Sequence, residues 1–403
     1  MTINEGQIVR GERDRSKLSE KALVALVFLS AFPYLFPNPF ILSGIQPYAL
    51  IFSLAVLVIL LFGGMRINIE DELLAVLGIG TTIAVFIAII SIAFYDLSGI
   101  AREISAYMNL FFVAGAFVAL RKASSLDLEP YFKICIGIWL LVGLLQLFVD
   151  RALFSNYMYH TNTSATRGVF GLSTEPSMYG IQLFFFLYLV KGFKRGKIAY
   201  YLLIAAWGVL VVRSATSLIF IGAFFFAELF DSESVANKIG WILGVSVGVV
   251  AVIVVLFTVL ADTRLVSLIN QAMNDGLSSL ISDASTNGRV TRITDAIDSA
   301  SKANFLPQGF GEKYGSAWGG AMNHLGFFSL FFILAVPAFF SRYYKTTSGK
   351  IVGYIIVLVL FFSTVQLSNP TIGLLIGIAS SKSILALNKT AYAKARQVRL
   401  HAS

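Results

Sequence analysis

The chain of 403 residues is 57% hydrophobic and only 13% charged, and it contains 35 Phe. A soluble domain of this length could not bury so much apolar surface, so the composition excludes an ordinary soluble enzyme and predicts an all-α, polytopic membrane protein. Its formal net charge of +9 comes from 31 Lys and Arg against 22 Asp and Glu.

The N-terminal segment, residues 1–21, is basic and precedes the first apolar run. It carries Arg10, Arg13, Arg15, Lys17 and Lys21. No small-residue cleavage site follows the apolar run, so we interpret the run as a retained first helix rather than a signal peptide. We expect residues 1–21 to form a cytoplasmic tail.

Twelve apolar runs are candidate membrane spans. Nine of them fall within residues 22–261 and three within residues 320–386, and residues 387–403 form a second tail. The runs cover residues 22–37, 47–63, 73–94, 104–120, 131–149, 177–190, 198–212, 215–230, 239–261, 320–340, 351–366 and 371–386. The sequence therefore predicts a bundle of about twelve transmembrane helices, in which the runs shorter than roughly 20 residues are tilted or have half-buried ends.

The basic residues between the runs favour one topology. When the N-terminus is placed in the cytoplasm and the runs alternate in direction, the basic loops 191–197 and 342–350 and the C-terminal tail all fall inside, as the positive-inside rule requires. Both termini are therefore expected in the cytoplasm. Because the net charge follows this topology, we expect membrane lipids, and no nucleic acid, as partners.

Residues 262–319 form the longest expected extracytoplasmic segment, between the ninth and tenth runs, and it is too long for a simple connector. Within 265–281, apolar residues recur at i, i+3, i+4 and i+7, which predicts an amphipathic helix along the membrane surface. After the polar break at 285–288, a second helix is expected over 289–302.

Basic residues on the expected outer side are mostly arginines. A planar guanidinium offers paired donors to phosphate or carboxylate oxygens, so this bias predicts recognition of an anion from outside. The alternative is that these side chains reach lipid phosphates at helix ends. The nine residues are Arg102, Arg151, Arg167, Arg213, Arg264, Arg289, Arg292, Lys302 and Lys313.

The stretch RGVFGLSTEPSMYG, from Arg167 to Gly180, precedes the sixth run. Pro176 suits the first turn of a helix, and Glu175 or its neighbours can cap the free N–H groups there. Glu175 also meets the positive end of the helix dipole. A structural helix start explains this much, but it does not explain Arg167 or the two glycines that follow it, which allow close backbone approach.

This stretch resembles a family signature. The run Arg-Gly-x-x-Gly-x-x-x-Glu-Pro-Ser is similar to that of Wzy-type O-antigen polymerases, within the O-antigen ligase and polymerase superfamily of bacterial envelope glycosyltransferases. The block RSATS at Arg213 resembles the family's Ser/Arg/Thr-rich bend. Asn287-Gly-Arg289, the helix after it and the turn LPQGFG at 306–311 resemble the family's arrangement of an Arg, a helix and a Pro- and Gly-containing turn. The resemblance covers residues 160–330 and the twelve-span layout.

The resemblance implies a glycosyltransferase of the bacterial inner membrane. Such an enzyme polymerises oligosaccharide repeat units linked to undecaprenyl diphosphate on the periplasmic face, by transferring the growing glycan to a new repeat unit. The product is O-antigen or a related surface polysaccharide, and a flippase and a chain-length regulator are the implied protein partners.

The implied reaction needs cations around a diphosphate leaving group and an acceptor for the proton of the attacking hydroxyl. Arginines can supply the cations, so no metal and no cofactor are expected. Neither the His and Asp spacing nor the single cysteine, Cys135, is typical of a metal site. The diphosphate and glycan are expected to contact Arg167, Arg213, Arg289, Arg292 and Tyr314; the alternative for the tyrosine is an interfacial anchor.

Two residues are candidates for proton transfer. Glu175 is the carboxylate best placed by the sequence, whereas Asp96, Asp150 and Asp262 fall at span boundaries and are more typical of interfacial anchors. Ligases of the superfamily have a His in the long outer loop that is thought to activate the acceptor hydroxyl. Here His324 lies closer to the tenth span than that pattern places it, so it is either a general base or a packing residue.

Two other functions stay open at this point. An O-antigen ligase of the same superfamily is the nearest alternative. A lipid-linked oligosaccharide flippase or another transporter is a second, but the sequence has no internal repeat, and its charged residues fall at span ends or in loops rather than within spans.

Overall fold

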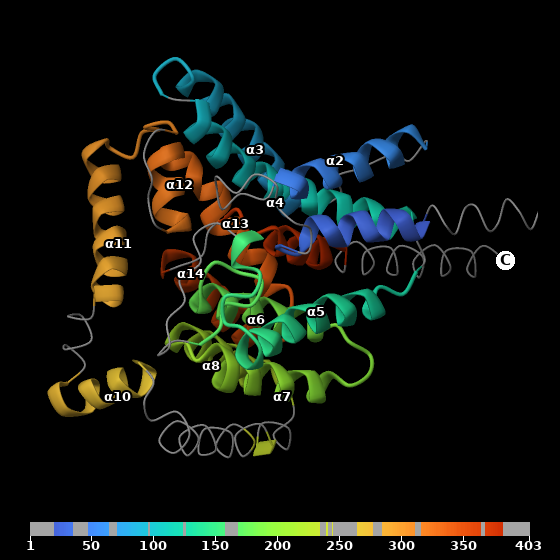
Figure 1. The fold of residues 1–403 in the computed structure, drawn as a ribbon. Coiled ribbons are helices and arrows are strands. Elements are labelled where there is room, and N and C mark those ends of the chain that lie inside the picture. Colours follow the sequence, from blue (N-terminus) through green and yellow to red (C-terminus); the bar gives the residue numbers. More distant parts are fainter. Residues whose placement is uncertain are drawn as a thin grey trace, which may run out of the picture.

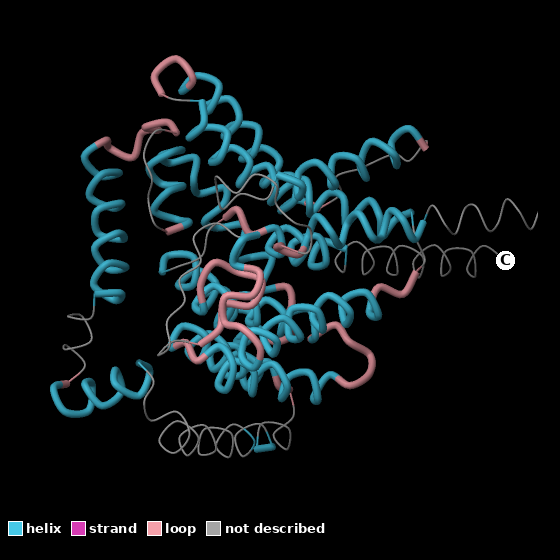
Figure 2. The backbone as a smooth tube through the Cα atoms, viewed as in Figure 1, coloured by secondary structure: helices cyan, strands magenta, loops and turns pink. Residues whose placement is uncertain are grey.

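The computed structural model describes residues 20–34, 47–63, 71–95, 97–123, 126–157, 168–233, 239–240, 244, 264–276, 284–310, 316–363 and 367–381. Within these ranges every regular element is a helix and no strand occurs (Figure 2). The chain therefore has the all-α architecture of a helical membrane protein. Backbone hydrogen bonds in hydrocarbon have to be satisfied internally, and helices meet this requirement.

The helices follow one another along the whole described chain (Figure 1). A first helix covers residues 20–31. It is followed by α2 (Pro47–Phe62), α3 (Glu72–Ser91), α4 (Leu97–Ala123), α5 (Glu129–Phe148), η1 (Ser155–Tyr157), α6 (Pro176–Val190), α7 (Lys197–Trp207), η2 (Gly208–Val212), α8 (Ala215–Asp231), α10 (Arg264–Asp275), α11 (Ala284–Lys302), α12 (Ala317–Leu325), η4 (Gly326–Ser329), α13 (Leu330–Ser341) and α14 (Thr347–Ser363). The last described helix is Pro370–Ser381.

Four helices in the described part of the chain are long and apolar enough to cross a membrane, so the count of twelve is not reproduced. They are Glu72–Ser91, Gly99–Ala123, Glu129–Phe148 and Ala317–Ser341. Five shorter apolar helices of 10 to 17 residues accompany them: Tyr48–Phe62, Pro176–Val190, Lys197–Val212, Thr347–Phe362 and Pro370–Ser381. An apolar run thus does not always become a full-length helix, because prolines and turns set the helix ends.

Helix α6 lies at the centre of the bundle. All of its residues except Met178 are buried, so it has no lipid-facing stripe. Its start agrees with the sequence: Pro176 occupies the first turn, where its missing N–H costs nothing.

Helices α6 and α8 run parallel and in close contact. Gly180 packs on Ser217, Phe184 on Phe220, and Lys191 pairs with Glu228. The partner numbers rise together along both helices, so both helices start at the same end of the bundle. We call this end the Arg213 end, after the residue that precedes α8, and the opposite end the Lys191 end.

Helix α14 lies antiparallel to α8 and connects it to α12. Gly349, near the start of α14, packs on Asp231 at the end of α8. Near the other end of α14, Phe361 stacks on Trp318 of α12, with ring centroids 4.8 Å apart. The start of α8, the end of α14 and the start of α12 therefore lie on the same side of the bundle.

The amphipathic helices occur where the 262–319 segment was expected to contain them. Val266 and Ile269 of α10 pack against Val209 and against the first turn of α8, so the apolar face of α10 covers the Arg213 end. The second helix, α11, begins at Ala284 and not at Arg289, so the predicted break at 285–288 is wrong. Surface-exposed polar residues are tolerated in this helix because Ala296 and Ala300 anchor it in the bundle.

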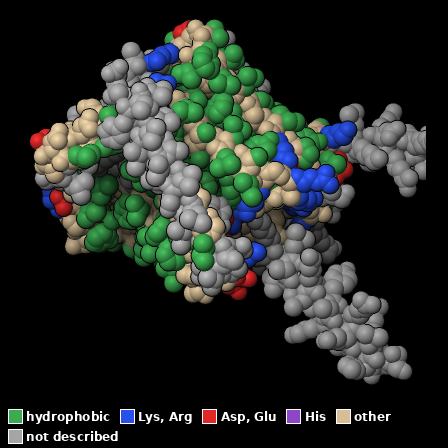
Figure 3. Space-filling model, turned by 90° about the horizontal axis from the view of Figure 1, so that it is seen from below, with side chains coloured by type: hydrophobic (Ala, Val, Ile, Leu, Met, Phe, Trp, Pro, Cys, Tyr) green, Lys and Arg blue, Asp and Glu red, His purple; other side chains and the backbone are tan. Residues whose placement is uncertain are grey.

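Basic side chains gather at the Lys191 end. Lys194 pairs with Asp127 at 3.2 Å, Lys133 donates to the carbonyl oxygen of Arg195, and the backbone N–H of Thr346 donates to Asp231. In the space-filling view, hydrophobic side chains occupy much of the described part of the visible face, and a group of Lys and Arg lies toward its right side (Figure 3).

Because α6 and α8 are in close contact at Gly180, a methyl group added there should destabilise the protein more than one added at an open glycine. A Cβ there would clash with the Ser217 side chain and lie 2.7 Å from the Ser217 Cα. Gly180→Ala should lower the melting temperature of the detergent-solubilised protein, by about 1–3 kcal/mol in unfolding free energy. Gly137→Ala in α5 is the matched control, because its Cβ would meet nothing within 4 Å. Equal melting temperatures for the two variants would contradict the parallel packing described here.

Candidate functional site

The loop before α6 lies directly on the end of η2. The N–H of Val169 donates to the carbonyl oxygen of Val211 at 3.2 Å. A side chain at Gly168 would clash with the carbonyl oxygen of Val212, so only glycine permits this approach. The first block of the resemblance, described from residue 168 on, therefore contacts the residues directly before the second block, 211–212, at the Arg213 end.

Gln146 of α5 fixes the conformation of this loop. Gly171 has φ +59, and its N–H donates to Oε1 of Gln146 at 2.7 Å while its carbonyl oxygen accepts from Nε2 at 2.9 Å. Gln146 is fully buried. This role could not be predicted from the sequence, because no residue near Gln146 indicates that it pairs with a loop 25 residues away.

Glu175 is the N-cap residue of α6, with extended backbone angles of φ −155 and ψ 160. Its side chain does not cap the helix; Oε1 instead accepts a hydrogen bond from the hydroxyl of Ser177. In the part of the chain that the structure describes, Oε2 has no hydrogen-bond partner. Half buried at the helix start, Glu175 thus keeps one oxygen available to another hydroxyl group.

Arg213 joins η2 to α8 in a strained conformation. Its φ of 49 and ψ of 40 lie in the left-handed region, which costs a residue with a Cβ roughly 1–2 kcal/mol. Its N–H donates to the carbonyl oxygen of Gly208 and its Nε to that of Leu210, at 3.1 and 2.8 Å. Strain of this kind is often found at functional sites.

Arg213 and Arg151 bring positive charge to the Arg213 end. Partial burial and the charge of Arg151 both lower the pKa of Arg213, so the two guanidinium groups lie close enough to repel each other. No ion pair joins Arg213 to a described carboxylate. The N-caps of α6 and α8, Glu175 and Ser214, make no side-chain cap, and both helix starts turn the positive ends of their dipoles toward this end. This combination suits an anion.

His324 lies in a separate, aromatic cluster. It is 3% exposed, it stacks on Phe310 with ring centroids 4.9 Å apart, and its Nδ1 lies 3.5 Å from the Tyr107 hydroxyl. None of the described contacts joins it to Glu175. The structure thus does not bring the two candidate proton-transfer residues together, and the surroundings of His324 match the packing alternative.

The described part of the predicted turn, residues 306–310, is held against α12. The N–H groups of Gln308 and Gly309 donate to the carbonyl oxygens of Asn323 and His324, at 3.0 and 3.3 Å. The Gln308 amide also donates to Oδ1 of Asn323 at 2.9 Å. Asn323 in turn donates to the carbonyl oxygen of Ala296, so one amide links the turn, α12 and α11.

The remaining predicted site residues are placed only in part. Arg167 and Tyr314 lie outside the described residues. Arg292 is exposed on α11. Arg289 lies in the second turn of α11 and not at its start; its side chain is not among those described.

Of the carboxylates that are alternatives to Glu175, one lies within the described residues and two lie outside them. Asp150 accepts a hydrogen bond from the N–H of Ala152 at 2.9 Å, as an anchor of a helix end would. Asp96 and Asp262 lie outside the described residues. Glu175 and Asp150 are therefore the two of these four that the structure describes, and Glu175 lies at the start of α6.

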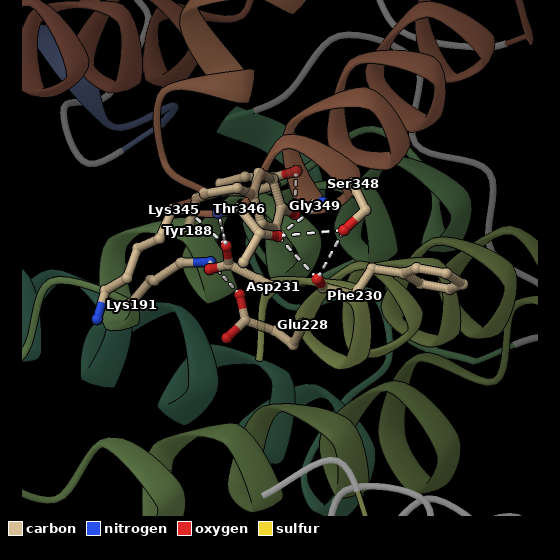
Figure 4. Close-up of polar contacts among 10 residues, drawn as sticks. Tyr188, Lys191, Glu228, Phe230, Asp231, Lys345, Thr346, Ser348 and Gly349 are labelled. Carbon is tan, nitrogen blue, oxygen red and sulfur yellow. Dashed lines mark hydrogen bonds and ion pairs between the residues drawn. The ribbon is translucent and has the colours of Figure 1, made fainter. Parts of the chain in front are cut away.

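A buried ion network lies at the Lys191 end (Figure 4). It was not predicted from the sequence. Lys191 forms ion pairs with Glu228 and, at 2.9 Å, with Asp231, and its Nζ lies 3.9 Å from the ring centroid of Tyr344. Asp231 also accepts from the N–H of Thr346. The network links α6, α8 and the turn before α14, and all its charges are paired, so it is suited to holding the helices together.

Removing the lysine from this network should destabilise the protein strongly. Lys191→Met leaves two carboxylates buried without their cation, which costs about 3–5 kcal/mol. Lys194→Met is the matched control: its ion pair is exposed, with 74% of the lysine side chain accessible, and should contribute about 0–1 kcal/mol. Thermal unfolding in detergent measures both, and a Lys191→Met protein as stable as the control would show that the network is not needed for stability.

Comparisons with known proteins add no family to this geometry. No family model matches the chain. No curated protein and no solved structure matches it either. The function proposed below therefore depends on the residues of the chain itself.

Proposed function

We propose that the chain is a membrane glycosyltransferase that polymerises oligosaccharide repeat units linked to undecaprenyl diphosphate. In this proposal the Arg213 end faces the periplasm of a bacterial inner membrane, and the Lys191 end and both termini face the cytoplasm. The observation that carries the proposal is the contact of the loop 168–175 with the Arg213 bend, which gathers two arginines and two helix starts beside one carboxylate. The concentration of basic side chains at the Lys191 end supports the orientation.

The Arg213 end would stabilise the leaving group. When the bond between the anomeric carbon and the phosphate oxygen breaks, negative charge develops on the diphosphate. Arg213, Arg151 and the positive dipole ends of α6 and α8 are suited to neutralise this charge. The strained backbone of Arg213 orients its guanidinium before substrate binds, so little reorganisation is needed during the reaction.

Glu175 would act on the acceptor sugar. The parallel register of α6 and α8 places the start of α6 beside that of α8, so a hydroxyl bound to Oε2 of Glu175 lies at the same end as the diphosphate. The hydroxyl oxygen forms the new bond to the anomeric carbon, and its proton passes to the carboxylate. In the same proposal Arg167, Arg289, Arg292 and Tyr314 contact the glycan or the second diphosphate, and a flippase and a chain-length regulator are the partners.

The buried position of His324 favours a polymerase over a ligase. A ligase of the resembled superfamily would need this side chain beside the acceptor hydroxyl, whereas here it is stacked on Phe310. The polymerase reaction requires only the carboxylate and the cations of the Arg213 end.

Replacing the charge of Glu175 tests the proposed proton acceptor. Glu175→Gln keeps the volume and the hydrogen bond from Ser177 but removes the base, so chain extension should fall about 10²–10⁴-fold. The measurement is polymer formation by the protein reconstituted in liposomes with purified undecaprenyl-diphosphate-linked repeat unit. Glu233→Gln, an exposed carboxylate beyond the end of α8, is the control and should be fully active. Normal polymer from Glu175→Gln would remove this residue from the mechanism.

Arg213 permits a test in which stability and activity change in opposite directions. Arg213→Gly relieves the left-handed strain, roughly 1–2 kcal/mol, and should raise the melting temperature. The same change removes the guanidinium, so chain extension should fall about 10²–10³-fold, as on losing one preorganised donor. Asn304→Gly, at another positive φ of 52, is the control: asparagine tolerates this region, so the change should leave both stability and activity nearly unaltered. An active Arg213→Gly protein would place the diphosphate elsewhere.

A further inference from the structure

An apolar groove runs along the outside of the bundle between α8 and α14. It encloses about 480 Å³. Its lining residues are Ile219, Gly222, Ala223 and Phe226 of α8 and Val352, Ile355 and Ile356 of α14. The residues on each helix follow helical spacing, so each helix contributes one continuous stripe.

The groove stripe of α8 is distinct from the stripe that packs on α6. Ser217, Phe220 and Phe224 face α6. By contrast Ile219 is 64% exposed and Phe226 is 53% exposed. A Cβ at Gly222 would meet nothing within 4 Å, so the middle of the groove is open. In a membrane this groove faces hydrocarbon.

The groove begins at Ile219, just beyond the part of the same helix on which α10 packs. Ile219 follows Arg213 by six residues, which corresponds to a rise of about 9 Å along α8. A lipid whose head group is bound at Arg213 and Arg151 would therefore direct its chain down α8 into the groove. An ordinary phospholipid head carries a single phosphodiester, whereas a diphosphate matches two guanidinium groups in charge and geometry.

We propose that this groove holds the polyprenyl chain of a diphosphate-linked lipid whose head group binds at the Arg213 end. The inference rests on the proposed function, since it takes the lipid-linked substrate as the ligand of that end. It assigns recognition of the lipid chain, as distinct from the sugar, to the groove between α8 and α14. The open space at Gly222 accommodates the methyl branches of an isoprenoid chain.

Photocrosslinking of the unmodified protein tests the occupant. The probe is a polyprenyl diphosphate with a diazirine in its chain, incorporated into liposomes of phosphatidylethanolamine and phosphatidylglycerol that contain the full-length protein. We expect labelled peptides from α8 and α14, and loss of labelling when unlabelled undecaprenyl diphosphate is added. Equal loss with added phosphatidylglycerol would identify the groove as a general lipid contact and overturn the proposal.

A variant that fills the groove provides the second test. Gly222→Leu places a side chain in the open space, whereas Gly137→Leu adds the same side chain to an exposed position of α5 with nothing within 4 Å. A polyprenyl chain displaced from the groove moves into lipid and not into water, so it loses only its packing contacts with the protein. Labelling of α8 should therefore fall about threefold to tenfold. Gly137→Leu should label as the unmodified protein does.

The outcomes separate this inference from the proposed function. Specific labelling of the groove without polymer formation would retain the lipid site and reject the polymerase. Polymer formation with labelling confined to other helices would reject the groove and retain the polymerase. Labelling of the groove that Gly222→Leu leaves unchanged, in protein that is monodisperse in detergent, would also overturn the groove.

Discussion

The parallel contact of α6 and α8 is the constraint on which the rest of the structure depends. Two adjacent helices that point the same way place like partial charges side by side at both ends. At the Lys191 end the negative ends of the two helices meet a buried lysine, which also pairs with Glu228 and Asp231. At the Arg213 end the positive ends meet further positive charge. The lysine therefore offsets negative charge at one end, whereas at the other end the two helix starts lie beside Arg213, with Glu175 as a carboxylate described there.

Small residues make this arrangement possible. Gly180 and Ser217 bring α6 and α8 together, and Gly168 brings the preceding loop onto η2. Aromatic side chains fill the space farther along, where Tyr188 packs edge-to-face on Phe224 with ring centroids 5.2 Å apart. Close packing by small residues is how helices associate in a solvent as apolar as their side chains. The rigidity of the Arg213 end thus originates deep within the bundle.

Much of the local structure could be predicted from the sequence, whereas the long-range pairing could not. Pro176 marked the start of α6, apolar periodicity marked α10, and the glycines after Arg167 indicated close backbone approach. The start of α11 was misplaced because Asn287 and Gly288 are typical of a break, and the buried contacts of Ala296 and Ala300 override that preference. Gln146 and Lys191 were missed because the groups they bind become neighbours only in the folded bundle.

The burial of α6 has a consequence for how the protein is made. Helix α5 covers part of α6 and precedes it in the chain, but α8 and the helix Pro370–Ser381, which also contact it, leave the ribosome later. Gln182, in the second turn of α6, donates a hydrogen bond to Thr371, which lies 189 residues later in the chain. At roughly 5–20 residues per second, about 10 to 40 seconds of synthesis separate the two. Throughout that interval this polar amide lacks its native partner, so other groups have to satisfy its hydrogen bonds during biogenesis.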